Sequence, residues 1–174
     1  MNPDRQYISE GGERKLLTDA LKENYSSILN YLWWLCSDAD LAKDLTQDVM
    51  VKAILKYRQF RGKSSFRTWL TRIAGNHFRD WLKKKKSDNY PNPDILPDRN
   101  STEDEIIRME KSAAVRQALS ELPLRYREPL VLKYFRQFSY LEIAETLSVP
   151  VGTVRSRIHN GTEMLKKPLE EFYG

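Results

Sequence analysis

The chain has 174 residues, and its 40% of hydrophobic residues is enough to build a folded core and to exclude a wholly disordered protein. A formal net charge of +5 favours a nucleic-acid partner, while the single cysteine, Cys36, excludes a disulfide framework and fits a reducing compartment. No apolar run approaches the roughly 20 residues that cross a membrane, and the N-terminus lacks the apolar core of a signal peptide. We therefore expect a cytoplasmic protein with no membrane insertion.

The charges divide the chain into three parts. Residues 1–86 contain 17 basic and 10 acidic side chains, residues 87–105 contain 1 and 6, and residues 106–174 contain 11 and 8. The acidic part is also rich in proline at residues 88–104, and proline restricts both itself and the residue before it to extended backbone. With no convincing strand, the sequence predicts an all-α protein of two small helical domains joined by an extended acidic linker. The expected bounds are a flexible tail at 1–15, a first domain at 16–87, the linker at 88–104 and a second domain at 105–174.

Three helices are expected in the first domain. The first, from about residue 16 to 36, has its apolar residues in phase: Leu17, Leu21, Tyr25, Ile28, Leu32 and Leu35. It ends at Cys36, which we expect to be a small buried side chain rather than a reactive thiol. The second, from about residue 40 to 57, is capped by Asp38 or a neighbour, and the third runs from about residue 67 to 86.

The second helix has a polar face that also carries apolar side chains. Asp44, Gln47, Asp48 and Arg58 lie opposite the expected core face, with Val51 and Leu55 among them. Apolar residues within a charged face indicate a surface for a protein partner. The alternative is an ordinary solvated face, since single exposed apolar residues are common.

The third helix and the loop before it have the pattern of a nucleic-acid-binding surface. Arg72, Asn76, Arg79, Lys83 and Lys86 form one stripe, which is suited to lie along phosphates. The amide of Asn76 adds chemistry that can read a base edge. The loop 60–66 adds flexible backbone and hydroxyl donors beside two aromatic rings that can stack on unpaired bases. A solvated charged face is the alternative, and His77, on the apolar side, is expected to be a core histidine.

The second domain ends in a predicted helix-turn-helix at residues 139–165. Helices are expected at about 103–122 and 124–135, and Ser139 with Glu142 then forms a capping box for a short helix. A tight turn at 147–149 leads to a helix from Pro150 to about Leu165. Its polar side carries Gly152, Ser156, His159 and Glu163, flanked by Arg155 and Asn160. This arrangement is typical of a DNA-reading motif, although an ordinary antiparallel helix pair has a similar pattern.

Two other classes of protein would account for part of this pattern. The chain lacks the residues expected of an enzyme that acts on nucleic acid. It has no clustered His/Cys set, no phosphate-cradling glycine loop and only two histidines, which are far apart in sequence. No metal, cofactor or catalytic residue is therefore expected. A free-standing transcriptional regulator that binds operator DNA as a dimer would explain the helix-turn-helix. It would leave the basic third helix and its loop without a role.

Three motifs in order resemble one family, the bacterial extracytoplasmic function (ECF) sigma factors of the sigma-70 family. The resemblance covers about Leu17 to Leu169. It rests on Asp44-Leu45-Thr46-Gln47-Asp48, which is similar to the family's acidic signature, on FRGKSSFRTWLTRIAGN at 60–76, and on IAETLSVPVGTVRSRIH at 143–159. The family implies sigma region 2 in the first domain and sigma region 4 in the second. Many members continue after VRSRI with an aromatic residue and further arginines, whereas this chain reads His159-Asn160-Gly161-Thr162, so promoter preference is not carried over.

The resemblance implies a specificity subunit of RNA polymerase with promoter DNA as its other partner. The first domain would bind the β′ clamp helices of core polymerase through Asp44, Leu45, Gln47, Asp48 and Val51. It would open the promoter −10 element and hold a flipped base with Phe60, Arg61, Lys63, Ser64, Ser65, Phe66, Arg72, Asn76, Arg79 and Lys83. The second would bind the β flap and read the −35 element with Gly152, Thr153, Arg155, Ser156, Arg157, His159 and Asn160. The linker would thread towards the RNA exit channel, and an anti-sigma protein is a further partner that the family allows.

Overall fold

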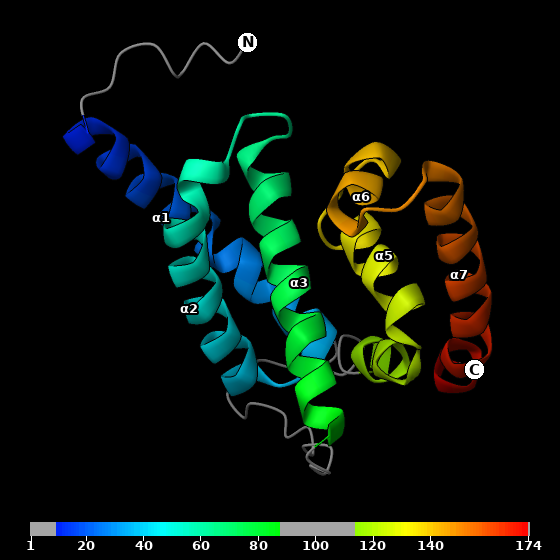
Figure 1. Ribbon diagram of the computed structural model, residues 1–174. Coiled ribbons are helices and arrows are strands. Elements are labelled where there is room, and N and C mark those ends of the chain that lie inside the picture. Colours follow the sequence, from blue (N-terminus) through cyan, green and yellow to red (C-terminus); the bar gives the residue numbers. More distant parts are fainter. Residues whose placement is uncertain (1–9, 88–113, 174) are drawn as a thin grey trace.

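The computed structural model describes residues 10–87 and 114–173, and every regular element within these ranges is helical (Figure 1). The prediction of an all-α fold is therefore confirmed, while the linker at 88–104 lies outside the described residues. Residues 114–121 are also helical. The other elements in chain order are α1 (Glu10–Cys36), α2 (Ala39–Lys56), the 3-10 turn η2 (Tyr57–Gln59), α3 (Phe66–Ser87), α5 (Leu124–Tyr134), α6 (Tyr140–Leu147) and α7 (Val151–Tyr173).

Two helices are longer than expected. Residues 10–15 were expected to belong to a flexible tail, yet α1 begins at Glu10 and continues through Gly11 and Gly12. Each glycine costs about 1 kcal/mol relative to alanine within a helix, but extending a helix that is already packed adds one hydrogen bond per residue. Likewise α7 continues past the expected end near Leu165 and contains Pro168.

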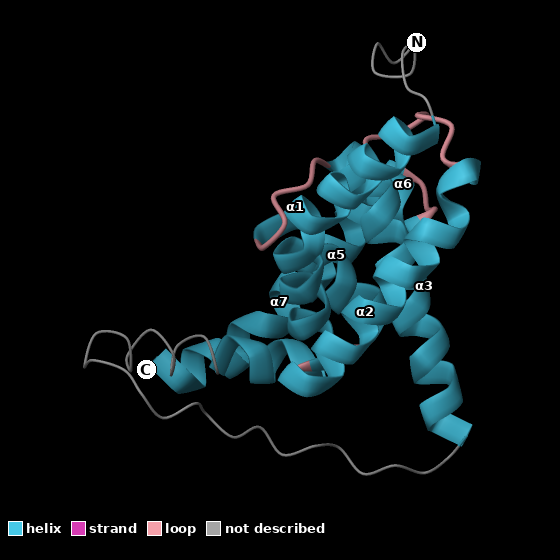
Figure 2. Ribbon diagram, turned by 90° about the vertical axis from the view of Figure 1, so that its left-hand side faces the viewer, coloured by secondary structure: helices cyan, strands magenta, loops and turns pink. Residues whose placement is uncertain are grey.

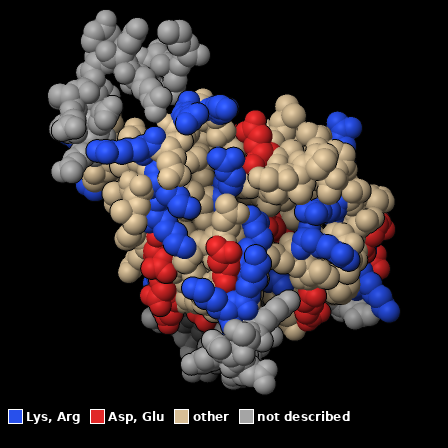
Figure 3. Space-filling view, viewed as in Figure 1, with Lys and Arg blue, Asp and Glu red and all other residues tan. Residues whose placement is uncertain are grey.

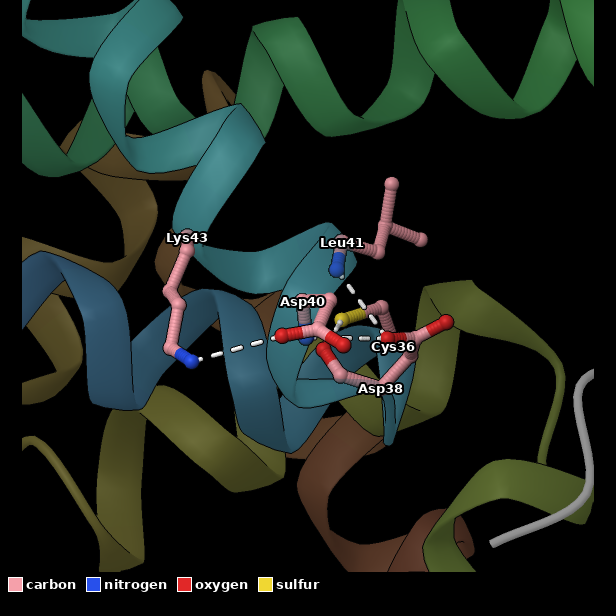
Figure 4. Close-up of polar contacts among 5 residues, drawn as sticks. All are labelled: Cys36, Asp38, Asp40, Leu41 and Lys43. Carbon is pink, nitrogen blue, oxygen red and sulfur yellow. Dashed lines mark hydrogen bonds and ion pairs between the residues drawn. The ribbon is translucent and has the colours of Figure 1, made fainter.

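The junction between α1 and α2 is fixed by a cap (Figure 4). Ser37 adopts a left-handed conformation with φ of 58°, which ends α1. The Asp38 side chain then accepts hydrogen bonds from the backbone amides of Asp40 and Leu41, both at 3.0 Å, as the sequence predicted. Cys36 donates its thiol to the Asp38 carbonyl at 3.2 Å. These contacts set the direction in which α2 leaves α1.

The described helices form two bundles that share one hydrophobic core. Helices α1, α2 and α3 pack on each other, and α5, α6 and α7 form the second bundle. The bundles also meet directly, with α5 against α1 and α6 against α3, and the same buried cluster includes Leu35 and Phe78 from the first and Leu130 and Phe138 from the second. The sequence predicted two units joined only by a tether, whereas the structure packs them together (Figures 1 and 2).

Candidate nucleic-acid interface

Within the basic stripe of α3, Asn76 and Lys83 are exposed to solvent and Arg72 and Arg79 are partly buried. Figure 3 shows Lys and Arg side chains gathered along the centre of the face that displays α2 and α3. The last turns of α3 extend beyond the other helices (Figure 2). Of the residues predicted for the −10 element, Arg61, Lys63, Ser65, Asn76 and Lys83 are exposed, and Phe60, Ser64, Phe66, Arg72 and Arg79 are partly buried.

The loop before α3 is held by aromatic rings. Phe60 lies edge-on to Phe66, with ring centroids 5.8 Å apart, and is tilted against Trp69 at 5.1 Å. Trp69 is buried and was not singled out from the sequence, although its position three residues after Phe66 places both rings on one side of the helix. Loop 60–66 is therefore anchored at both ends on the same cluster.

Ser65 has a structural role in this loop. Its hydroxyl oxygen accepts from the Thr68 amide at 3.0 Å and donates to the Thr68 hydroxyl at 2.9 Å. These bonds cap the first turn of α3, whose initial amides have no partner within the helix. The hydroxyl that was expected to contact DNA thus fixes where α3 starts.

Arg79, a residue predicted for the −10 element, binds a carboxylate from the other bundle. Its Nη1 donates to both oxygens of Glu128 at 2.6 Å, and its Nη2 donates to Asn76 Oδ1 at 2.5 Å. Tyr31 of α1 donates its hydroxyl to the same carboxylate at 2.7 Å. Burial, reinforced by the charge of Glu128, raises the pKa of Tyr31 well above its usual value. The sequence could not predict the contact between Tyr31 and Glu128, because the two residues lie 97 positions apart.

A second polar contact joins the bundles near the start of α3. Arg67 donates to the backbone carbonyl of Arg136 and lies over the Phe138 ring, 4.5 Å from its centroid. Arg136 in turn donates to the Thr71 hydroxyl at 3.1 Å. Burial, with a smaller effect from Arg67, lowers the pKa of Arg136 to about 10. Hydrogen bonds and contacts with the Phe138 ring thus hold both arginine side chains at this junction.

The outer face of α2 is polar with apolar side chains among its charges, as predicted. Asp44, Gln47, Asp48 and Val51 are exposed, and Leu55 is 76% exposed. Leu45 was expected on this surface but is only 2% exposed, because its position in α2 turns it towards α1 and α3 with Ala42 and Val49. Leu45 therefore belongs to the core.

His77 links α2 to α3 and lies at the edge of the core. Its Nδ1 lies 2.6 Å from Lys52 Nζ, and its Nε2 lies 3.1 Å from Asp48 Oδ2. Both ring nitrogens have partners, so the prediction that His77 is a structural histidine agrees with its packing. No group of three His, Cys, Asp or Glu side chains in the described part of the chain could hold a metal ion.

The helix-turn-helix forms as predicted. Ser139 Oγ accepts from the Glu142 amide at 3.2 Å while the Glu142 carboxylate accepts from the Ser139 amide at 2.8 Å, which completes the capping box. Ser148 turns the chain in a left-handed conformation with φ of 54°. Val154 and Ile158 of α7 are buried, so the opposite side of this helix faces outward.

The outward side of α7 carries the residues predicted for the −35 element. Ser156 donates its hydroxyl to the Thr153 carbonyl at 3.0 Å. The Arg155 guanidinium lies 5.8 Å from the centroid of the Tyr140 ring on α6. Of the predicted set, Gly152, Arg155, Ser156, His159 and Asn160 are exposed, and Thr153 and Arg157 are partly buried.

Within the described residues, no helix combines the length and the apolar character needed to span a membrane.

Two family models match the chain, each over one of the bundles. Sigma-70 region 2 covers residues 20–87, and Sigma-70, region 4 covers residues 112–165. The ECF RNA polymerase sigma factor SigW of Bacillus subtilis (strain 168) is 31% identical over 92% of this chain and 92% of its own length. The chain belongs to the ECF sigma factors. A second sigma factor of the same organism, YlaC, is 35% identical over 88% of this chain and 92% of its own length.

Two solved structures have the same fold. The sigma factor RpoE of Bartonella quintana, solved in complex with the anti-sigma factor NepR, superposes with a TM-score of 0.76 at 25% identity over 90% of this chain and 98% of that one. CnrH, solved with the cytosolic domain of CnrY, has the same fold, with a TM-score of 0.70 at 21% identity over 92% of each chain. In the chain described here, the bundle α1–α3 corresponds to sigma-70 region 2, and the bundle α5–α7 falls largely within region 4.

Proposed function

We propose that this sigma factor directs bacterial RNA polymerase core to specific promoters and starts DNA melting at the −10 element. The observation that carries the proposal is that one chain presents two separate surfaces suited to DNA, on α3 and on α7. A free-standing helix-turn-helix regulator needs only the second surface. Such a subunit contributes binding and positioning, with no catalytic chemistry of its own, and works in the cytoplasm.

The bundle α1–α3 would bind the polymerase β′ clamp helices and act on the −10 element. The outer face of α2 offers Asp44, Gln47, Asp48 and Val51, a mixture of charge and exposed apolar surface that fits a protein partner. The exposed part of α3 offers cations for phosphates and Asn76 for a base that has left the stack. Loop 60–66, held by its aromatic cluster, would border the base, whose unstacking costs a few kcal/mol.

The bundle α5–α7 would bind the β flap and place the start of α7 in the major groove of the −35 element. Docking the N-terminal part of the second helix is the usual geometry of a helix-turn-helix. The exposed Arg155 and Ser156 are the best placed for base edges, and the partly buried Arg157 for phosphate. An anti-sigma protein is a further proposed partner, because Bartonella quintana RpoE shares this fold and was solved bound to one.

Promoter-specific transcription by core polymerase, with and without the purified chain, tests the proposal. We expect specific transcripts only when the chain is added. Tight operator binding by the chain alone, with no stimulation of core polymerase, would instead identify the dimeric regulator. Within the holoenzyme, Asn76→Ala should impair promoter opening more than −35 binding, and an equal loss of both would contradict the role proposed for Asn76.

A further inference from the structure

The polar contact between α2 and α3 passes through His77. Asp48 and Lys52 lie four residues apart on α2, a spacing at which an aspartate and a lysine ordinarily form a direct ion pair on the surface of a helix. In the structure each of them contacts the His77 ring instead, with Lys52 Nζ 2.6 Å from Nδ1 and Asp48 Oδ2 3.1 Å from Nε2. A side chain of α3 therefore lies between the two charges and contacts both.

The exposure of these three side chains differs. The His77 side chain is 13% exposed and Lys52 is partly buried, whereas the Asp48 side chain is 65% exposed. Only one oxygen of Asp48 contacts the ring, and among the described residues no donor reaches the other oxygen, Oδ1. The Asp48 carboxylate is thus attached to the folded chain by one oxygen and open to a partner at the other.

Lys52 determines the direction of the hydrogen bonds. An ammonium group has donors and no acceptor, so Nδ1 of the ring accepts and Nε2 donates its proton to Asp48. A partner that occupies one ring nitrogen in this way sets both the tautomer and the orientation of the imidazole. Lys52 therefore orients the ring, and the ring orients the carboxylate.

Asp44, one turn earlier on the same face of α2, has no such support. It is exposed, and no donor from the described residues reaches its carboxylate. Both aspartates belong to the surface proposed to bind core polymerase, and Figure 3 shows acidic side chains over α2. A side chain that rotates freely loses rotamer entropy when a partner binds, and one that is already held loses less. Asp48 is therefore better ordered than Asp44 before a partner arrives.

We propose that His77 is a positioning residue for the binding of core polymerase, and that it orients the Asp48 carboxylate towards a cationic group of the polymerase. The inference rests on the proposed function of the outer face of α2. His77 offers a partner little surface of its own, so it acts through Asp48. An ordered carboxylate binds a cation at a smaller entropic cost. The binding surface on α2 thus depends on a residue of α3.

The test measures the affinity of the full chain for core polymerase together with its stability in urea. His77→Asn keeps an oxygen one bond beyond Cγ, where His77 has Nδ1, so Lys52 retains an acceptor while Asp48 loses its donor. Asparagine and histidine also have similar helix propensities. Binding is read by the anisotropy of a chain labelled with fluorescein at its N-terminus. We expect His77→Asn to weaken binding about threefold to tenfold, with an unchanged urea midpoint.

A conservative variant and a double-mutant cycle separate positioning from packing. His77→Gln carries its amide one bond further from the backbone, near the place of Nε2, and should recover most of the affinity that His77→Asn loses. In an Asp48→Ala background, His77→Asn should cause no further loss, because its effect passes through the carboxylate. In an Asp44→Ala background it should cause the full loss, so Asp44 is the matched control.

A variant of Lys52 gives a second reading that leaves His77 unchanged. Lys52→Met removes the ammonium group that orients the ring and keeps the apolar part of the side chain. The affinity for core polymerase should fall by less than in His77→Asn, because Nε2 can still reach Asp48. This loss should also vanish in the Asp48→Ala background, and a loss that persists there would contradict positioning.

Failure of the inference and failure of the proposed function give different results. A parent chain that does not bind core polymerase refutes the proposed function and the inference with it. A parent chain that binds, with His77→Asn binding equally well, overturns only the positioning role. Equal losses from His77→Asn in the Asp48→Ala and Asp44→Ala backgrounds would also overturn it. A shifted urea midpoint with a loss that His77→Gln does not recover would identify His77 as a packing residue alone.

Discussion

Lys52 and His77 are joined through a short hydrogen bond, with Lys52 Nζ 2.6 Å from His77 Nδ1. The ammonium group can only donate, so Nδ1 must accept, and the ring proton therefore lies on Nε2. From there it points to Asp48 Oδ2 at 3.1 Å. His77, at the edge of the core on α3, thus contacts the Asp48 carboxylate on the outer face of α2.

Replacing His77 should weaken the packing of α2 on α3. His77→Leu leaves the partly buried Lys52 ammonium without its acceptor, and such a loss lowers the free energy of unfolding by about 1–3 kcal/mol. Urea denaturation followed by circular dichroism measures the change. Asp48→Asn, at an exposed position that keeps an acceptor oxygen, is the control and should change stability by less than about 0.5 kcal/mol. Equal losses of stability in both variants would show that the contribution of Lys52 to stability does not depend on the His77 ring.

The two glycines of α7 should respond oppositely to alanine. At Gly152 an added Cβ meets nothing within 4 Å, so Gly152→Ala should raise the free energy of unfolding by up to about 1 kcal/mol through helix propensity. At Gly161 it would lie 2.8 Å from Leu130 Cδ1 and 3.3 Å from Tyr126 Cβ. Gly161→Ala should therefore lower stability by about 1–3 kcal/mol. Thermal unfolding of the pair checks both signs, and stabilisation by Gly161→Ala would contradict the packing of α7 on α5.

The capping box of α6 should make stability depend on acid pH. The Ser139 backbone amide donates to the Glu142 carboxylate and holds its pKa below the ordinary value of 4.5. The unfolded chain binds this proton more readily, so the contribution is present above the ordinary pKa and is lost as the pH falls through the folded pKa. The parent chain should be up to about 1 kcal/mol more stable than Glu142→Gln at neutral pH. This difference should shrink towards about pH 3, and a difference that grows on acidification would refute the cap.

Cys36 should be slow to react in the folded chain. Burial raises the pKa of its thiol from 9.0 to about 11, which reduces the thiolate at about pH 8 from roughly one in ten to roughly one in a thousand. Labelling by a thiol-disulfide reagent should therefore be about 100-fold slower in buffer than in denaturant. Since Cys36 is the single cysteine of the chain, the signal has one source. Equal rates would place the thiol in solvent.

Local patterns predicted the helices and their outer faces well. The capping box at Ser139, the cap at Asp38 and the apolar side of α7 depend on neighbours a few residues apart, so the sequence contains the whole signal. Periodicity also identified the exposed residues of α2. The family motif, by contrast, placed Leu45 on the same surface, because a sequence motif lists residues in order and does not show which of them face inward.

Contacts between distant segments were not predictable in the same way. The sequence pattern predicts Arg79 as one of the cations of a DNA-binding stripe and gives no indication of its partner Glu128, which lies 49 positions away on another helix. Gly75 gave no indication that it makes room for a carboxylate from another bundle. Such contacts depend on how two helical surfaces meet, which is determined by the tertiary arrangement and not by propensity or period.

The hydroxyl of Ser156 donates its only proton to the Thr153 carbonyl of its own helix. In this rotamer its oxygen can offer only lone pairs to whatever approaches from outside. In the major groove, lone pairs are matched by the amino groups of adenine N6 and cytosine N4, whereas guanine O6 and thymine O4 are themselves acceptors. In the proposed complex with the −35 element, this intrahelical hydrogen bond would leave Ser156 as an acceptor and would favour the base of a pair that carries an amino group, adenine or cytosine.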